Sequence, residues 1–258
     1  MITIAIANQK GGVGKTTTAI NIATAMAATG WKTLLIDLDP QGNASTGMGI
    51  SSDNREYSSY DLLIDQTPLA GCVSSTNIPG LDIVPATVDL SGAEVELVSV
   101  EDRTGRLSSA LAAHSGHDIC FIDCPPSLGL LTLNALGAAD TLMVPLQCEF
   151  FALEGLSQLL KTVEQVQQRF NPDLGIVGVV LTMFDRRNRL TDQVADDVRE
   201  VLGGLVFESV IPRNVRLSEA PSHGLPALVY DHSCAGSRAY IALARELISR
   251  LPEKRKAA

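Results

Sequence analysis

The segment 9–17, Gln-Lys-Gly-Gly-Val-Gly-Lys-Thr-Thr, gathers glycines, lysines and hydroxyl side chains in a short stretch of chain. Glycines at positions 11, 12 and 14 allow the backbone to curl so that several N–H groups face one anion. Lys15 is then placed to reach the β- and γ-phosphates of a nucleotide, and the Thr16 hydroxyl to ligate Mg²⁺. The pattern predicts a phosphate-binding loop for ATP. A glycine-rich turn without a ligand is disfavoured, because Gly-Lys-Thr stands between an apolar run and a helical pattern.

Two residues depart from the ordinary phosphate-loop pattern. Its first glycine would fall at position 9, where this chain has Gln9, and a second lysine, Lys10, lies inside the loop. One lysine suffices in an ordinary loop, so Lys10 supplies either denser compensation of the triphosphate charge or a contact elsewhere. A solvated side chain at Lys10 is the third possibility.

Carboxylates end two apolar runs of the chain. Asp37 and Asp39 close the run 34–39, and Asp123 closes the run 120–123. In an open parallel sheet, ligands bind at the carboxyl ends of the strands. There a carboxylate can hold Mg²⁺, directly or through water, or orient an attacking water. Helix capping is the alternative for either segment alone, but together with the loop the acids form one consistent set.

Apolar runs and helical patterns alternate along the chain. Strands are expected at 2–7, 32–37, 81–85, 118–123, 140–146, 176–184 and 205–211, and helices at 15–29, 89–101, 103–114, 128–138, 152–169, 191–201 and 237–251. Such alternation predicts an α/β protein whose mostly parallel sheet is covered by helices on both faces. We expect a single domain over residues 1–251 and a frayed, disordered tail at 252–258.

Composition and charge restrict the class of protein. The net charge of −9 argues against a surface that binds nucleic acid throughout. Residues 1–160 hold 6 Lys and Arg against 17 Asp and Glu, whereas residues 161–258 hold 14 against 12. The basic residues therefore concentrate late in the chain, either as ordinary solvated helices or as a local basic face. With neither a membrane span nor a signal peptide in the pattern, and with cysteines that read as reduced thiols, we expect a cytoplasmic protein.

Four motifs of the chain together resemble a known family. They are Lys-Gly-Gly-Val-Gly-Lys-Thr-Thr at 10–17, Asp-Leu-Asp-Pro-Gln-Gly-Asn at 37–43, Ile-Asp-Cys-Pro-Pro-Ser at 122–127 and Ile-Pro-Arg-Asn-Val-Arg-Leu-Ser-Glu-Ala-Pro-Ser at 211–222. The chain resembles the ParA/Soj DNA-partitioning ATPases, which belong to the deviant Walker A class of phosphate-loop (P-loop NTPase) proteins. The similarity runs from residue 2 to about 250, and the segment 146–156 also fits it.

The resemblance implies roles for individual residues. Lys10 matches the lysine that reaches across an ATP-sandwich homodimer to the partner's nucleotide, and Asp39 the carboxylate that activates or positions water. With the phosphate lysine, the implied catalytic residues are Lys10, Lys15 and Asp39. The implied nucleotide-binding residues are Lys10, Gly11, Gly12, Val13, Gly14, Lys15, Thr16, Thr17, Pro212 and Asn214. The implied Mg²⁺ residues are Thr16, Asp123 and, as support for the metal shell, Asp37.

The resemblance also implies partners. The family binds double-stranded DNA without sequence preference, as an ATP-bound dimer, and is released when ATP is hydrolysed. The resemblance implies that Arg187 and Arg216 contact DNA, and that Arg186, Arg189 and Arg213 contribute further contacts. A ParB-type centromere-binding protein is expected to stimulate a slow hydrolysis. The protein is then nucleoid-associated, and no membrane partner is expected.

Two readings of a different class remain. A MinD-like membrane-positioning ATPase would carry a C-terminal amphipathic helix, and an apolar stripe does run through 241–251. A helix that covers the sheet explains that stripe equally well. A metallocluster carrier related to nitrogenase iron proteins would use Cys124 beside Asp123, but no second suitable cysteine is evident.

Overall fold

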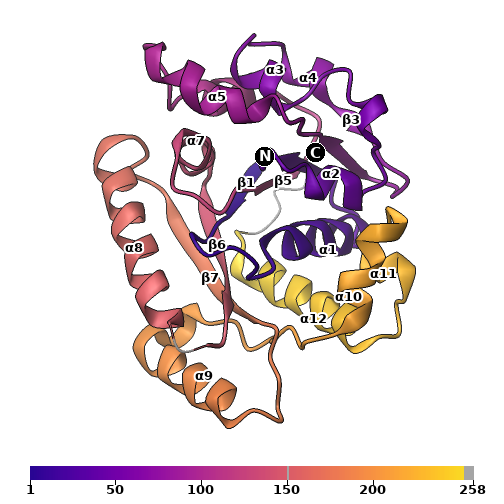
Figure 1. Ribbon diagram of the computed structural model, residues 1–258, viewed down its shortest axis with the longest axis vertical. Helices are drawn as coiled ribbons and strands as arrows, with labels where there is room; N and C mark the ends of the chain where they lie inside the picture. Colours follow the sequence, from indigo (N-terminus) through magenta and orange to yellow (C-terminus); the bar gives the residue numbers. More distant parts are fainter. Residues whose placement is uncertain (150, 253–258) are drawn as a thin grey trace.

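In the computed structural model, which describes residues 1–149 and 151–252, the apolar runs pair into a seven-stranded sheet (Figure 1). The strands are β1 (Ile2–Ile6), β2 (Thr33–Asp37), β3 (Ser74–Ser75), β4 (Leu81–Val84), β5 (Ile119–Asp123), β6 (Thr141–Gln147) and β7 (Gly175–Thr182). Their order is β3-β4-β2-β5-β1-β6-β7, and the described strand pairs are parallel except β3 with β4. The predicted α/β class and mostly parallel sheet are confirmed.

Helices cover both faces of the sheet (Figure 1). They are α1 (Lys15–Ala28), α2 (Asn43–Gly47), α3 (Ser59–Leu63), α4 (Leu69–Cys72), α5 (Leu90–Glu96), α6 (Arg106–Ala112), α7 (Leu130–Ala138), α8 (Ala152–Arg169), α9 (Arg189–Leu202), α10 (Val215–Glu219), α11 (Ala227–Tyr230) and α12 (Ala235–Arg250). One face packs against α1, α2 and α10–α12, and the other against α3–α9. Both faces are therefore shielded from water, as a parallel sheet requires.

Alternate residues of each strand feed two separate apolar cores. Ile4 and Ile6 of β1 belong to the core under α1 and α12, whereas Ala5 between them belongs to the core under α7 and α8. In β2, Leu35 packs on the first side, and its neighbours pack on the second. Successive side chains of a strand point to opposite faces, so a continuous apolar run fills both cores at once.

The expected strand at 205–211 is wrong. This segment forms a 3₁₀ turn at Gly203–Leu205 and then touches β7 at isolated points. Phe207 N donates to the carbonyl of Val179 and Ile211 N to that of Leu181, so four residues of the segment span only two of β7. The N–H groups between them, at 208 and 209, donate instead to the carboxylate of Glu246 on α12. The Glu246 carboxylate thus replaces the strand-to-strand hydrogen bonds at 208 and 209. The apolar pattern of 205–211 gives no sign of this distant contact.

Several other boundaries differ from expectation. The expected helix at 89–101 is split into α5 and a 3₁₀ turn at Leu97–Ser99, and the two-residue strand β3 was not anticipated. Helices α2, α3, α4, α10 and α11 have only four or five residues, too few for an apolar periodicity to register. The expected disordered tail at 252–258 falls, apart from its first residue, outside the described residues. Among the described residues, no helix is both long enough and apolar enough to cross a bilayer.

Candidate functional site

The segment 9–14 connects the carboxyl end of β1 to the first residue of α1. Gly12 and Gly14 have φ angles of 75° and 87°, a left-handed conformation that glycine adopts without strain. The Thr182 hydroxyl, at the end of β7, donates to the carbonyl of Val13 at 2.8 Å and so anchors the loop. The loop is held at a helix N-terminus, where backbone N–H groups and the helix dipole favour an anion.

Lys15 lies deep in this site. Its side chain is only 6% exposed, and Nζ donates to the backbone carbonyl of Lys10 at 3.0 Å. Burial lowers the pKa of Lys15, while the nearby carboxylates of Asp123 and Asp39 partly offset the shift. An ammonium that is short of hydrogen-bond acceptors has the electrostatic demand that phosphate oxygens satisfy.

Three aspartates gather at the carboxyl ends of β2 and β5. Asp37 and Asp123 are directly opposite each other in the parallel ladder of these strands, and both are fully buried. Burial raises the pKa of Asp123 well above its ordinary value, and the negative charge of Asp37 adds to the shift. Both carboxylate oxygens of Asp123 are buried without a hydrogen-bond partner among the described residues. The Thr16 hydroxyl nearby partly offsets the rise in the pKa of Asp123. Buried acceptors left open beside Thr16 fit a hard cation.

The donor set around Asp123 suits Mg²⁺ better than a metal held by protein alone. No group of three or more His, Cys, Asp or Glu side chains in the described part of the chain is arranged to enclose a metal. Mg²⁺ keeps several waters and takes the rest of its octahedral shell from one or two protein groups and substrate phosphates. Thr16 and Asp123 are a pair of this kind.

Asp37 and Asp39 are tied to the chain around them. One oxygen of Asp37 accepts hydrogen bonds from the backbone N–H and the hydroxyl of Ser45, at 2.8 and 2.7 Å, and the other from Asp39 N at 3.1 Å. Burial nevertheless raises the pKa of Asp37 to about 6. Asp39, 8% exposed, accepts from Gln41 N at 3.0 Å. Asp37 therefore fixes the N-terminus of α2, while Asp39 lies near enough to Lys15 for its charge to raise the pKa of that lysine.

A cavity of about 310 Å³ opens beside the loop. Its lining joins Gly14 and Thr17 to Pro212 and Asn214, which were expected to contact the base. The side-chain oxygen of Asn214 accepts from Arg216 N at 2.9 Å and so begins α10. The Tyr240 hydroxyl, also in the lining, lies 3.1 Å from that of Thr18. The structure thus brings together the expected phosphate and base residues, with room for an adenine-sized group.

Comparison with known proteins decides the family. A family model described as an AAA domain matches residues 1–176. The chain is 58% identical over 250 residues to the chromosome partitioning protein ParA of Caulobacter vibrioides, covering 96% of this chain and 94% of that protein. It is 51% identical over 245 residues to the sporulation initiation inhibitor protein Soj of Bacillus subtilis, covering 95% and 97%. The chain belongs to the ParA/Soj family.

Solved structures agree with the ParA/Soj assignment. Cobyrinic acid a,c-diamide synthase from Mycobacterium smegmatis, solved with an ATP analog and magnesium, matches with a TM-score of 0.82 and 38% identity, over 95% of this chain and 93% of that one. The cell division ATPase MinD of Pyrococcus furiosus matches with a TM-score of 0.80 but only 24% identity, over 97% and 99%, which shows a common fold alone. The chain is accordingly a P-loop ATPase of the chromosome-partitioning family, as the sequence predicted.

The stripe on α12 gives little support to a MinD-like reading of this ParA/Soj member. Of the stripe residues, Ala244 and Leu247 are buried in the core shared with α1, Ile248 and Leu251 pack against its edge, and Ile241 is partly exposed. Packing within the fold therefore accounts for four of the five stripe residues. Cys124, the candidate for a metallocluster, is buried as well, and burial raises its pKa.

Lys10, the lysine expected to reach across a dimer, differs from Lys15 in its exposure. Its side chain is 44% exposed and forms an ion pair with Glu149, which follows β6. Its backbone carbonyl meanwhile accepts from Lys15 Nζ. The loop therefore presents one buried lysine and one outward lysine. Glu149 lies in the segment 146–156 that resembles the family, but nothing in the sequence singled it out as a partner of Lys10.

The five arginines expected to contact DNA are all exposed and come from two adjoining segments. Arg186, Arg187 and Arg189 lie between β7 and the start of α9, and Arg213 and Arg216 lie before and in α10. The segments meet where Phe184 and Pro212 form an isolated bridge, and Arg213 N donates to the carbonyl of Phe184. Sequence could not show this adjacency, because it depends on the irregular path of 205–211 along β7.

Two of these arginines are held by acids. Arg187 binds both oxygens of Asp185, at 2.9 and 2.8 Å, and these contacts lower the pKa of Asp185 to about 2. Arg216 pairs with Glu219 at 2.9 Å and lies over the ring of Tyr230. With Arg187 87% exposed and Arg216 52% exposed at the side chain, solvent screens both pairs, which leaves the guanidinium groups available to phosphates.

Glu94 is a further residue of the site that the sequence did not indicate. Its carboxylate, on α5, accepts from the N–H groups of Leu130 and Leu131, at 2.9 and 3.3 Å. It thereby satisfies the N-terminus of α7, whose own N-cap residue, Gly129, has no side chain to do so. Residues 124–129 connect Asp123 to α7. By binding the N-terminus of α7, Glu94 of α5 therefore fixes the end of the loop that begins at Asp123.

Proposed function

We propose that this chain is an ATP-driven DNA-partitioning switch, which dimerises around ATP, binds DNA without sequence preference and is released by hydrolysis. The observation that carries the proposal is the different exposure of the two lysines in the loop. Lys15 is buried among the acids, and Lys10 points outward from the same turn. An outward lysine beside a phosphate site is placed to act on the nucleotide of a second subunit.

The loop 10–17 would hold the phosphates, with Lys15 and Thr17 as side-chain ligands, and Pro212 and Asn214 would line the base. Thr16 and Asp123 would hold Mg²⁺, with Asp37 supporting that shell through its contacts with α2. Bound Mg²⁺ would neutralise charge on the phosphate oxygens. Asp39, partly free and close to Lys15, is placed to orient the attacking water.

Hydrolysis also requires compensation of charge that develops on the γ-phosphate. In this proposal part of that compensation comes from the partner's Lys10, so the reaction is complete only in the dimer. ATP then stabilises the dimer by mass action, and its hydrolysis removes that stabilisation. Slow turnover follows, because the protein acts as a switch whose ATP-bound state must persist.

Dimerisation would place two copies of the arginine surface on one particle. Each copy consists of Arg186, Arg187, Arg189, Arg213 and Arg216. Doubling the number of phosphate contacts strengthens binding to DNA and steepens its dependence on salt. Such binding would make the protein nucleoid-associated. A ParB-type partner with a basic segment would suit the acidic excess of residues 1–160 and would stimulate hydrolysis.

Light scattering coupled to size-exclusion chromatography tests the dimer. The protein should elute as a monomer without nucleotide and as a dimer with ATP and Mg²⁺. Lys10→Ala should stay monomeric with ATP while still binding a fluorescent ATP analog. Lys32→Ala is the matched control, because Lys32 is an exposed lysine at the amino end of β2, whereas the loop follows the carboxyl end of the parallel strand β1. Normal ATP-dependent dimers of Lys10→Ala would refute the role assigned to Lys10.

A further inference from the structure

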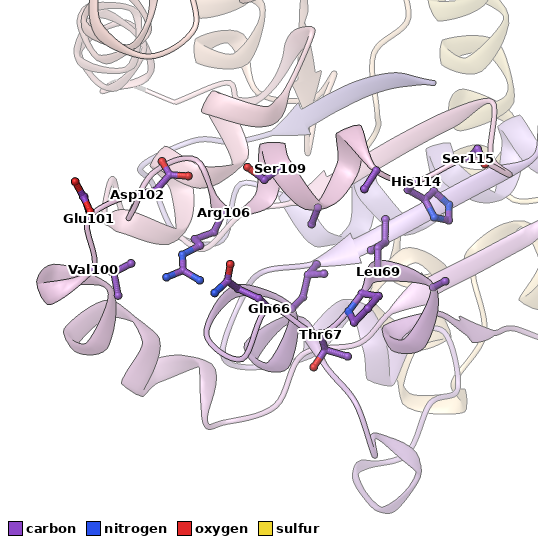
Figure 2. Close-up of a pocket in the computed structure, with 15 residues that line it drawn as sticks. Gln66, Thr67, Leu69, Val100, Glu101, Asp102, Arg106, Ser109, His114 and Ser115 are labelled. Atoms are coloured by element: carbon purple, nitrogen blue, oxygen red, sulfur yellow. The ribbon is translucent and has the colours of Figure 1, made fainter.

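A second cavity, of about 690 Å³, lies apart from the nucleotide site (Figure 2). It opens between α6 and the turn that joins α3 to α4, with the segment 100–102 at one end. Its lining shares no residue with the phosphate loop, the aspartates or the base cavity. The volume is within the range of small-molecule sites, which are concave, mostly apolar and carry a few polar groups.

Arg106, the first residue of α6, brings a positive charge to this cavity. Its Nε and Nη1 atoms are buried and have no hydrogen-bond partner among the described residues. In Figure 2 its guanidinium points from α6 toward the loop that carries Gln66. A guanidinium has five N–H donors, and leaving buried ones unsatisfied is unfavourable. A ligand that draws the head group toward the cavity would relieve this.

The acids of the lining do not neutralise Arg106. Glu101 and Asp102 both line the cavity, but none of the ion pairs within the described residues joins either of them to Arg106. The Asp102 carboxylate lies instead against Gly105, where a methyl group would collide with it. Arg106 thus has no ion-pair partner in the described lining, while Glu101 and Asp102 add two negative charges to the same cavity, which penalise a doubly charged ligand more than a singly charged one.

Apolar side chains supply the larger part of the lining surface, and the cavity extends along α6. Apolar lining comes from Leu62, Pro68, Leu69, Ala70, Val100, Ala110 and Ala113. Arg106 and Ala113 are seven residues apart on one helical path, which places them about 10 Å from each other. Beyond Ala113, His114 closes the far end, with Nε2 engaged by Nδ1 of His117 at 2.8 Å. The cation is thus at one end of a long apolar trough.

We propose that this cavity binds a small amphipathic molecule with a single carboxylate. The carboxylate contacts the guanidinium of Arg106, and an apolar chain or ring system extends along α6 past Leu69 toward Ala113. The head group gains charge-assisted hydrogen bonds, and the body loses contact with water. A phosphomonoester would fit worse, because the two acids of the lining repel its second charge.

Sodium decanoate is a suitable probe, since its extended chain is of similar length to the trough. Titration followed by ¹H–¹⁵N chemical shifts, below the micellar concentration, should give saturable changes at α6 and at the α3–α4 turn. Arg106→Gln should weaken decanoate binding by about tenfold or more, the size expected for loss of a charge-assisted hydrogen bond. Decanol and decyl phosphate should each bind the unaltered protein more weakly than decanoate does.

Arg103→Gln is the matched control, because Arg103 is an exposed arginine three residues before Arg106 and does not line the cavity. Ala110→Met fills the trough and should abolish binding without touching the charge. Circular dichroism checks that each variant is folded. No saturable shift with decanoate, shifts elsewhere on the protein, or equal affinity in Arg106→Gln would overturn the proposal.

Discussion

The ion pair between Lys10 and Glu149 should restrain the dimer that Lys10 is proposed to build. Within one subunit, Glu149 holds the side chain that would have to cross to the partner. Glu149→Gln keeps the size of the side chain and removes its charge. If the pair competes with the dimer, this substitution should favour the ATP-dependent dimer.

The exposure of the two side chains limits the strength of the ion pair and so the size of the effect. Lys10 is 44% and Glu149 31% exposed at the side chain, so solvent screens the pair and its strength is at most about 1 kcal/mol. A symmetric dimer must break two such pairs, one in each subunit. Relief of both gives up to about 2 kcal/mol, which corresponds to roughly 30-fold tighter dimerisation.

Sedimentation velocity with a slowly hydrolysed ATP analog and Mg²⁺ measures the monomer–dimer constant directly. Glu154→Gln is the control, because Glu154 is an exposed acid in the first turn of α8. The gain in Glu149→Gln should shrink at high salt, since salt weakens the pair in the unaltered protein as well. A weaker dimer would refute the reasoning and mean that Glu149 supports Lys10 within the dimer.

Three further outcomes are expected. Since burial raises the pKa of Asp37 from 3.8 to about 6 and raises that of Asp123, the stability that these two carboxyl groups contribute to the nucleotide-free protein is fully present below about pH 4 and is lost as the pH rises toward 7, by on the order of 3 kcal/mol for Asp37 alone. Urea unfolding at several pH values measures this, and Asp123→Asn should flatten the profile; an unchanged slope would contradict it. Ser45→Ala should lower the free energy of unfolding by about 1–3 kcal/mol, because the hydroxyl donates to Asp37 and accepts from Ala86 N at 3.0 Å, a loss that thermal unfolding would detect. The double change Arg187→Ala/Arg216→Ala should abolish the ATP-dependent DNA mobility shift while ATP-dependent dimers persist, and a shift that survives would exclude this surface.

The sequence was sufficient for the features that rest on local pattern. Buried strands and long helices appear as apolar runs and periodicity, and the loop 9–17 has a spacing that few other structures require. That Asp37 and Asp123 lie at the carboxyl ends of strands followed from the apolar runs and a parallel sheet, whereas only the structure shows that the two residues are direct partners in the ladder. The roles in catalysis and DNA binding came from resemblance, and they stay predictions.

What the sequence missed depends on contacts between distant residues. Glu94 holds α7 from another helix, Glu246 replaces a strand ladder at 208 and 209, and Glu149 pairs with Lys10. Each is an ordinary exposed-looking acid in a one-dimensional pattern. Its task is fixed only when the sheet brings its partner within reach, so periodicity and motif spacing carry no signal for it.

The place of β1 in the sheet has a consequence for how the protein is made. Strand β1, which is translated before the other described strands, lies between β5 and β6, with Ile2 opposite Ile119 and Ile4 opposite Thr141. Its hydrogen-bonding partners are therefore translated more than a hundred residues later. Contacts this distant in sequence slow folding, and until they form the strand is an exposed apolar segment. The loop that follows β1 cannot take its nucleotide-binding shape before most of the chain exists, so a truncated nascent chain should not retain ATP.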